Sequence, residues 1–220
     1  MYLHRFTDGI GLCMRCRSLL QLLLLTLLLA GCGAIPGTRQ AGVGAGAQSA
    51  DTPEVPQRAQ TMYEQAAAIM ASGDYLEAQF RFQEFLMQYP GYPGAHVNLA
   101  IIYASNGDDQ GAENSITDGL MIDSQYPPAL NQLGMLLRRQ GRFQEAESAY
   151  LKAVMADPDY PLPHYNLGVL NELYLQQLES ALLHYERYQA LAENDKQVGK
   201  WIADLKRRIG SSQRTANVTE

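Results

Sequence analysis

Side chains capable of catalysis are few in this sequence, and none falls in the spacing of a known catalytic motif. The chain of 220 residues has three cysteines, Cys13, Cys16 and Cys32, and four histidines. It contains no HExxH, GxxxxGK or GxSxG pattern, which would place a zinc ion, a phosphate or a serine nucleophile. Because no cysteine follows Cys32, neither a disulfide framework nor a cysteine zinc site can hold the rest of the chain. We therefore expect neither an enzyme nor a metal site.

Cys32 is the one cysteine whose surroundings predict its chemistry. Arg15 and Arg17 precede an apolar run over residues 19–30, which would rise about 18 Å as a helix and is too short for a hydrocarbon core of about 30 Å. Basic residues, a short apolar run and small residues at its end are typical of an export signal. Residues 29–32 read LAGC and resemble the bacterial lipobox. That resemblance implies a diacylglycerol and an N-acyl lipid on Cys32, after cleavage before it.

The same resemblance organises the N-terminal region. Residues 1–31 are expected to be the signal peptide, and a true translation start at Met14 is a hypothesis. Gly33 rather than Asp follows the lipidated residue, which in related sorting systems implies the outer membrane, with the domain facing the periplasm. Residues 32–56 are rich in Gly, Ala and Pro and lack hydrophobic periodicity, so we expect a flexible linker. Acyl chains rather than a protein segment would then hold the chain on the membrane.

The helices expected after the linker follow from an internal repeat in the sequence. Gly73, Gly107 and Gly141 are spaced 34 residues apart, which suits a turn glycine that ends the first helix of each unit. The four units are 59–92, 93–126, 127–160 and 161–195. Small residues, among them Gly134, recur where two helices would cross, and the fourth unit lacks the turn glycine and has one extra residue before Ala181.

This period resembles the tetratricopeptide repeat (TPR). The resemblance implies an all-α fold, a right-handed α-solenoid of about four helical hairpins over residues 57–195. Residues 196–209 have apolar side chains in one helical stripe, typical of the helix that closes the open edge of a solenoid. Docking of that helix into a partner is the alternative. Residues 210–220 are expected to be a disordered tail.

Within this frame the remaining polar groups have structural explanations. His96 and His164 take equivalent repeat positions where a bulky core residue belongs, so packing is the favoured role. His184 lies on the second helix of the fourth unit with no partner at metal-ligand spacing. The acidic pairs Asp108–Asp109 and Asp157/Asp159 fall in expected loops and are interpreted as solvated turn residues.

The resemblance implies a concave peptide-binding groove lined by the first helices. Its expected residues are Tyr63, Asn98, Ile101, Asn131, Gln132, Met135, Arg138, Arg139, Tyr165, Asn166 and Glu172. Asn98 and Asn166 match the position whose amide bonds a ligand's backbone in the family, since an amide offers both a donor and an acceptor. Arg138 and Arg139 could bind a carboxylate, and a solvated face is the alternative.

Composition and resemblance together predict a binding function. A net charge of −6 argues against nucleic acid, which calls for a basic patch. Lipobox, linker and stacked repeats resemble the lipoproteins of type IV pilus biogenesis that assist secretin assembly. We therefore expect a scaffold or assembly factor for an envelope complex, whose groove binds a protein partner. The alternatives are the repeat lipoprotein of TonB–ExbB–ExbD energy-transducing systems and an accessory regulator of a peptidoglycan enzyme.

Overall fold

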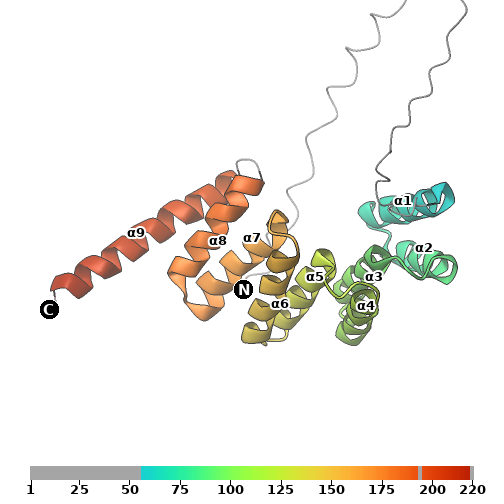
Figure 1. Cartoon of the computed structure of the whole chain (residues 1–220), viewed down its shortest axis with the longest axis horizontal. Coiled ribbons are helices and arrows are strands. Elements are labelled where there is room, and N and C mark those ends of the chain that lie inside the picture. The colour runs from blue at the N-terminus through green and yellow to red at the C-terminus, as the bar shows by residue number, and fades with distance from the viewer. Residues whose placement is uncertain (1–55, 193–194, 219–220) are drawn as a thin grey trace, which may run out of the picture. The chain divides into compact units, whose positions relative to one another are not determined.

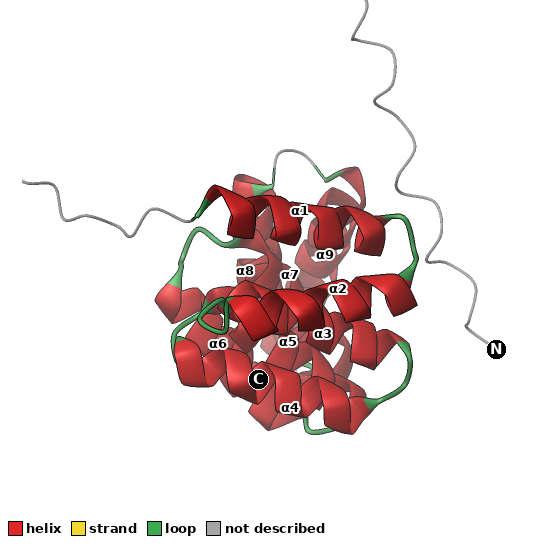
Figure 2. Ribbon diagram, turned by 90° about the vertical axis from the view of Figure 1, so that its right-hand side faces the viewer, coloured by secondary structure: helices red, strands yellow, loops and turns green. Residues whose placement is uncertain are grey.

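The computed structural model describes residues 56–192 and 195–218, with side chains up to residue 212. These residues form helices and loops but no strand (Figure 2). The expected signal peptide, Cys32 and nearly all of the linker lie outside the described residues. The helices are α1 (Gln57–Ala71), α2 (Tyr75–Gln88), α3 (Pro93–Ser105), α4 (Asp109–Ile122), α5 (Pro127–Arg139), α6 (Phe143–Ala156), α7 (Pro161–Leu170), the π-helical turn η1 (Asn171–Leu175), α8 (Leu178–Leu191) and α9 (Lys196–Val218). None of the described helices is long and apolar enough to cross a membrane.

The eight helices α1 to α8 form four hairpins, one in each predicted repeat. Each odd-numbered helix packs most extensively against the even-numbered helix that follows it, and each hairpin then contacts the next. Figure 1 shows the hairpins stacked in chain order from α1 to α8, with α9 extending past α8. The first helices of neighbouring repeats also touch, α3 with α5 and α5 with α7. The predicted all-α solenoid is confirmed.

The turn glycines end the first helices as their spacing predicted. Gly73, Gly107 and Gly141 have φ angles of +89°, +79° and +77°, a region that glycine enters without the steric cost of a Cβ. In repeat four the corresponding position is Gln176, with φ +57°, and it is the one described non-glycine residue with positive φ. Its backbone therefore adopts the same turn with a side chain that disfavours it.

The extra residue of repeat four is accommodated within its first helix. After Leu170 the helix widens into the π-helical turn η1, Asn171–Leu175, a form that holds one more residue per turn and occurs mostly as a single turn. The turn keeps α7 and α8 in hairpin contact while altering the direction of the side chains it carries. The irregularity therefore falls on the wall of the expected groove.

Two glycines allow the helices of repeats three and four to cross closely. A Cβ at Gly134 would lie 2.5 Å from the ring of Tyr150, and one at Gly168 would lie 2.4 Å from the ring of Tyr185. Both tyrosine rings are fully or almost fully buried. The small residue in the first helix and the large one in the second are therefore complementary, as the repeat pattern indicated.

The solenoid ends with α9, which packs against α8. Val198 and Leu205 are fully buried there, and the Trp201 ring lies 5.5 Å from that of Tyr185. This contact agrees with the expected closing helix. However, α9 continues to Val218, so the expectation of a disordered tail from residue 210 is wrong for residues 210–218. The helix continues beyond the end of its apolar stripe, and hydrophobic periodicity alone does not reveal such a polar extension.

Candidate functional site

The expected groove residues lie on α1, α3, α5, α7 and η1, and four of them meet around one pocket. The pocket has a volume of about 350 Å³ and lies among α3, α4 and α5. Gln132, Met135, Arg138 and Arg139 line it, together with Ala100, Ala104, Ala112, Ile116, Leu136 and Tyr174. Its floor is therefore apolar and its rim polar, which is the usual composition of a ligand site.

The two arginines of the pocket have different roles. Arg139 donates to the backbone carbonyl of Ala104 at 2.8 Å and forms an ion pair with Asp109. It therefore joins repeat three to repeat two. Arg138 is half-buried, and among the described residues it has no hydrogen bond or ion pair. Of the predicted pair, Arg138 is thus the free cation.

Repeat three also contains a buried hydroxyl, that of Tyr150 on α6. The Tyr150 hydroxyl has no hydrogen-bond partner among the described residues, although a buried polar group is normally paired. Burial raises the pKa of Tyr150 to about 12, while the charge of Arg138 lowers it and Tyr174 raises it. Arg138 and Tyr174, which act electrostatically on the Tyr150 hydroxyl, both line the pocket.

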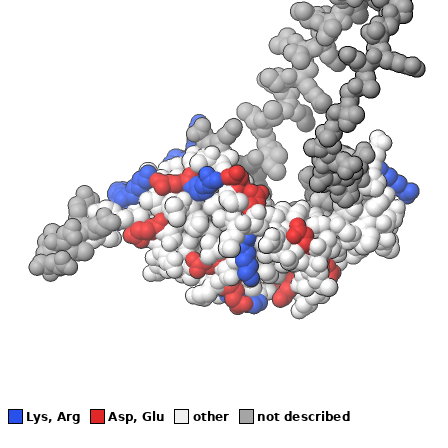
Figure 3. Space-filling view, viewed as in Figure 1, with Lys and Arg blue, Asp and Glu red and all other residues white. Residues whose placement is uncertain are grey.

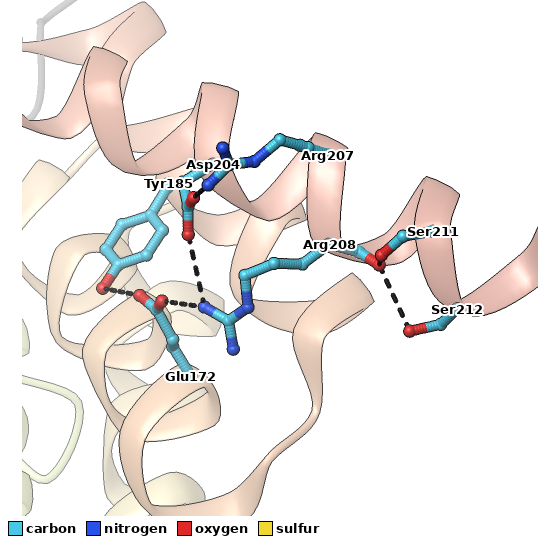
Figure 4. Close-up of polar contacts among 7 residues, drawn as sticks. All are labelled: Glu172, Tyr185, Asp204, Arg207, Arg208, Ser211 and Ser212. Carbon is cyan, nitrogen blue, oxygen red and sulfur yellow. Dashed lines mark hydrogen bonds and ion pairs between the residues drawn. The ribbon is translucent and has the colours of Figure 1, made fainter.

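Glu172, another expected groove residue, is occupied by a contact with the terminal helix. Its Oε1 accepts from Arg208 Nη1 at 2.7 Å, and its Oε2 accepts from the Tyr185 hydroxyl at 3.2 Å (Figure 4). Arg208 Nη1 also lies 3.7 Å from Asp204 on α9. Burial and the neighbouring Glu172 carboxylate raise the pKa of Tyr185. This side of the groove is therefore closed by the chain itself.

The predicted asparagines form hydrogen bonds between neighbouring repeats. Asn98 Nδ2 donates to the Tyr63 hydroxyl at 2.9 Å, and Asn166 Nδ2 donates to Asn131 Oδ1 at the same distance. Asn131 and Asn166 are only 1% and 6% exposed. Their carboxamides are thus used within the solenoid, which leaves Asn98 as the more accessible of the two predicted backbone-binding amides.

The other two expected groove residues lie apart from the pocket. Ile101 on α3 is half-buried. Tyr165 lies within the aromatic cluster at the α9 end, with its ring 5.2 Å from Tyr188 and 6.1 Å from Trp201. Tyr165 therefore contributes to the closed end of the solenoid.

The histidines form a pair that the sequence did not indicate. His164 and His184 lie with their Nδ1 atoms 3.2 Å apart, a contact between the two helices of repeat four that sequence spacing does not reveal. Burial lowers the pKa of His164, helped by Arg187, and the His164 Nε2 lies 3.3 Å from the Pro158 carbonyl. Burial and His164 lower the pKa of His184 to about 4. No described cluster of three or more His, Cys, Asp or Glu could hold a metal ion.

Charge on the viewed face is uneven. Figure 3 shows Lys and Arg side chains along α9, interspersed there with Asp and Glu, and further acidic side chains spread over the hairpins. Lys206 of α9 binds Glu186 of α8 at 2.8 Å, so part of this basic charge holds the terminal helix in place.

Two models of the tetratricopeptide repeat match the chain, over residues 70–133 and 127–160. No curated protein matches it. Among solved structures, the chain is similar to PilF of Pseudomonas aeruginosa, with 24% identity, 70% of this chain and 69% of that chain covered, and a TM-score of 0.63. It is also similar to TTC0263, a TPR protein of Thermus thermophilus, with 21% identity, 68% and 82% coverage, and a TM-score of 0.59.

A third solved structure shows a ligand. The first TPR domain of Spaghetti (RPAP3), bound to the HSP90 peptide SRMEEVD, is 22% identical, with 54% of this chain and 95% of that chain covered and a TM-score of 0.50. These likenesses show the fold, and they confirm the expectation of stacked repeats of this type.

Proposed function

We propose that this chain, which carries tetratricopeptide repeats, is a lipid-anchored scaffold that assembles a protein complex of the bacterial envelope. The observation that carries the binding role is the pocket of about 350 Å³ with the free cation Arg138 on its rim. An apolar floor beside one unpaired charge suits a protein segment with both an apolar and an acidic group. The peptide bound by the Spaghetti domain supports a protein ligand for this fold.

The envelope location is part of the proposal and rests on the sequence. The LAGC segment ending at Cys32 supports lipidation, with an outer-membrane anchor and the repeats facing the periplasm. Palmitate labelling of the full chain and of Cys32→Ser tests this step. We expect the label and outer-membrane fractionation to be lost in Cys32→Ser, whereas Cys16→Ser keeps both. Label retained by Cys32→Ser contradicts the proposed anchor.

The finer role that we propose is assembly of the type IV pilus machinery. The resemblance of lipobox, linker and repeats to lipoproteins of pilus biogenesis supports it, as does the similarity to PilF. The tagged full chain would be captured from detergent-solubilised envelope, and its partners identified. A secretin as the dominant partner supports the pilus role. A TonB-system protein or a cell-wall hydrolase contradicts that role and selects one of the alternatives.

A charge reversal tests the pocket as the site of capture. Arg138→Glu places a negative charge on the rim, and we expect partner capture to fall at least about tenfold because a charge-assisted contact is lost. The control is Lys152→Glu, the same change at an exposed residue of α6 with no ion pair among the described residues. Equal capture by both variants would move the interface away from the pocket. Unchanged circular dichroism would show that both variants fold.

A further inference from the structure

Repeats three and four each have a glycine, a buried tyrosine and a charged residue at equivalent positions, and the charged residue differs in sign. Tyr150 and Tyr185 pack behind the equivalent glycines Gly134 and Gly168, at nearly the same distance from each. Arg138 and Glu172 stand 34 residues apart, at the equivalent position of the first helix. In repeat four the Tyr185 hydroxyl donates to Glu172, and in repeat three the charge of Arg138 lowers the pKa of the Tyr150 hydroxyl against the larger effect of burial.

In repeat four this arrangement binds a carboxylate. The Glu172 carboxylate accepts one hydrogen bond from the Tyr185 hydroxyl and one from the guanidinium of Arg208. Its side chain is only 15% exposed, so the charge is stabilised by these two donors rather than by water. A tyrosine hydroxyl and a guanidinium are therefore sufficient here to hold a carboxylate (Figure 4).

In repeat three the two donors are present and the carboxylate is missing. The Tyr150 hydroxyl is buried without a partner, and the guanidinium is supplied by Arg138, which has no hydrogen bond or ion pair among the described residues. A buried hydroxyl without a partner is unfavourable in the unbound chain. The group that would satisfy both donors is an anion with two acceptor oxygens.

We propose that repeat three binds the side-chain carboxylate of an acidic residue from a protein partner, with an adjacent apolar side chain in the pocket. The proposal rests on the proposed scaffold function and names its ligand chemistry. Repeat four uses a side-chain carboxylate, Glu172, which favours this source over a chain terminus. The buried apolar lining, with Ala112, Ile116 and Leu136, accounts for the adjacent apolar residue. The Tyr150 hydroxyl is buried in the unbound chain, so binding requires a side-chain movement that exposes it to the ligand.

Blocked peptides test the carboxylate directly. The isotope-labelled full chain would be titrated with acetyl-Gly-Leu-Glu-Gly-amide and with its Gln counterpart, while amide signals of residues 132–139 and 171–175 are followed by NMR. We expect the Glu peptide to bind at least about tenfold more tightly, because a hydrogen bond to a charged group is stronger than one to a neutral amide. A third peptide, acetyl-Gly-Gly-Leu with a free C-terminal carboxylate, is expected to bind as weakly as the Gln peptide.

Two variants assign the donors. Tyr150→Phe and Arg138→Met are each expected to reduce the preference for Glu over Gln, whereas Lys152→Met keeps it. Tyr150→Phe should fold at least as stably as the unaltered chain, since it loses only an unpaired hydroxyl, so its loss of preference would not reflect unfolding.

Three outcomes overturn the proposal: equal binding of the Glu and Gln peptides, a preference unchanged in both variants, or tighter binding of the free-acid peptide. If Arg138→Glu abolishes partner capture while no peptide shows a carboxylate preference, the scaffold function stands and the carboxylate proposal fails. If the preference for the Glu peptide is found but no partner is captured from the envelope, the carboxylate proposal stands and the scaffold function fails.

Discussion

Tyr150 and Tyr185 fill equivalent positions behind a glycine, yet only the Tyr185 hydroxyl has a hydrogen-bond partner among the described residues. The difference comes from one residue in the first helix, Glu172 in repeat four and Arg138 in repeat three. A carboxylate accepts from a hydroxyl, whereas a guanidinium only donates. The tyrosine hydroxyl therefore has a structural partner in repeat four and none among the described residues in repeat three.

This contrast predicts opposite effects of the same substitution. Tyr185→Phe leaves Glu172 with one donor fewer at a site that is mostly buried, and we expect it to lower the free energy of unfolding by about 1–3 kcal/mol. Tyr150→Phe is the matched control and is expected to leave stability unchanged or to raise it. Urea denaturation of both variants measures the difference. Equal destabilisation would show that the Tyr150 hydroxyl has a partner after all.

At the scale of the element, the hairpin of α7 and α8 differs from the other three in two ways. One is the π-helical turn followed by Gln176 with φ +57°. The other is the contact between His164 and His184. Both affect the stability of the fold and can be tested without knowing the ligand.

Gln176→Gly is expected to stabilise the chain. A non-glycine residue in the left-handed region costs about 1–2 kcal/mol, and glycine removes that cost but adds unfolded-state entropy, so we expect a net gain of up to about 1 kcal/mol. Gln177→Gly is the control, since that residue is the N-cap of α8 with φ −96° and gains nothing from glycine. A loss of stability in Gln176→Gly would show that the Gln176 side chain makes a stabilising contact that outweighs the strain.

The histidine pair predicts a loss of stability in mild acid. The pKa of both histidines lies below the ordinary value of 6.5, and that of His184 is about 4. The unfolded chain therefore binds more protons than the folded chain below about pH 6.5, so stability is lost as the pH falls from about 6.5 to about 4. Arg187 also faces His164 and opposes its protonation.

His184→Gln should remove much of this dependence. The melting temperature of the unaltered chain is expected to fall more steeply between pH 6.5 and pH 4 than that of the variant, and a thermal scan at several pH values measures both. An equal fall in the two proteins would assign the acid sensitivity to carboxylates elsewhere.

For the whole molecule, sequence was sufficient where a feature is local and periodic. The spacing of Gly73, Gly107 and Gly141 predicted the hairpins, because each turn depends on one residue's own backbone. The contact between Arg208 and Glu172 depends instead on where α9 lies after four hairpins have stacked. No local pattern encodes that position.

The same reasoning explains which parts of the candidate site were foreseen. Gln132, Met135, Arg138 and Arg139 were predicted to face the groove, and they line the pocket. Tyr174 was missed because it reaches the pocket from the π-helical turn. The extra residue of that turn was visible in the sequence, but the direction in which it points the following side chains was not. The buried amides Asn131 and Asn166 were assigned to a ligand, because periodicity gives a face of a helix but not the neighbour that covers it.

The terminal helix is expected to matter for stability only over its packed part. Removal of residues 196–220 uncovers the surface that Val198 and Leu205 bury, and we expect a loss of at least about 2 kcal/mol, together with self-association on gel filtration. Removal of residues 213–220 is the control and should leave the urea midpoint unchanged. A similar loss in both truncations would show that the last turns of α9 also stabilise the fold.

Besides its effect on stability, α9 limits where a further repeat could be added, because it carries Arg208. It reaches Glu172 from the position after the last hairpin, where the first helix of an additional repeat would otherwise begin. A hairpin inserted between α8 and α9 would carry Arg208 away and leave Glu172 without its cation, unless the new helix brought one of its own. Designers who wish to extend this array should therefore duplicate an interior unit and preserve the final junction intact.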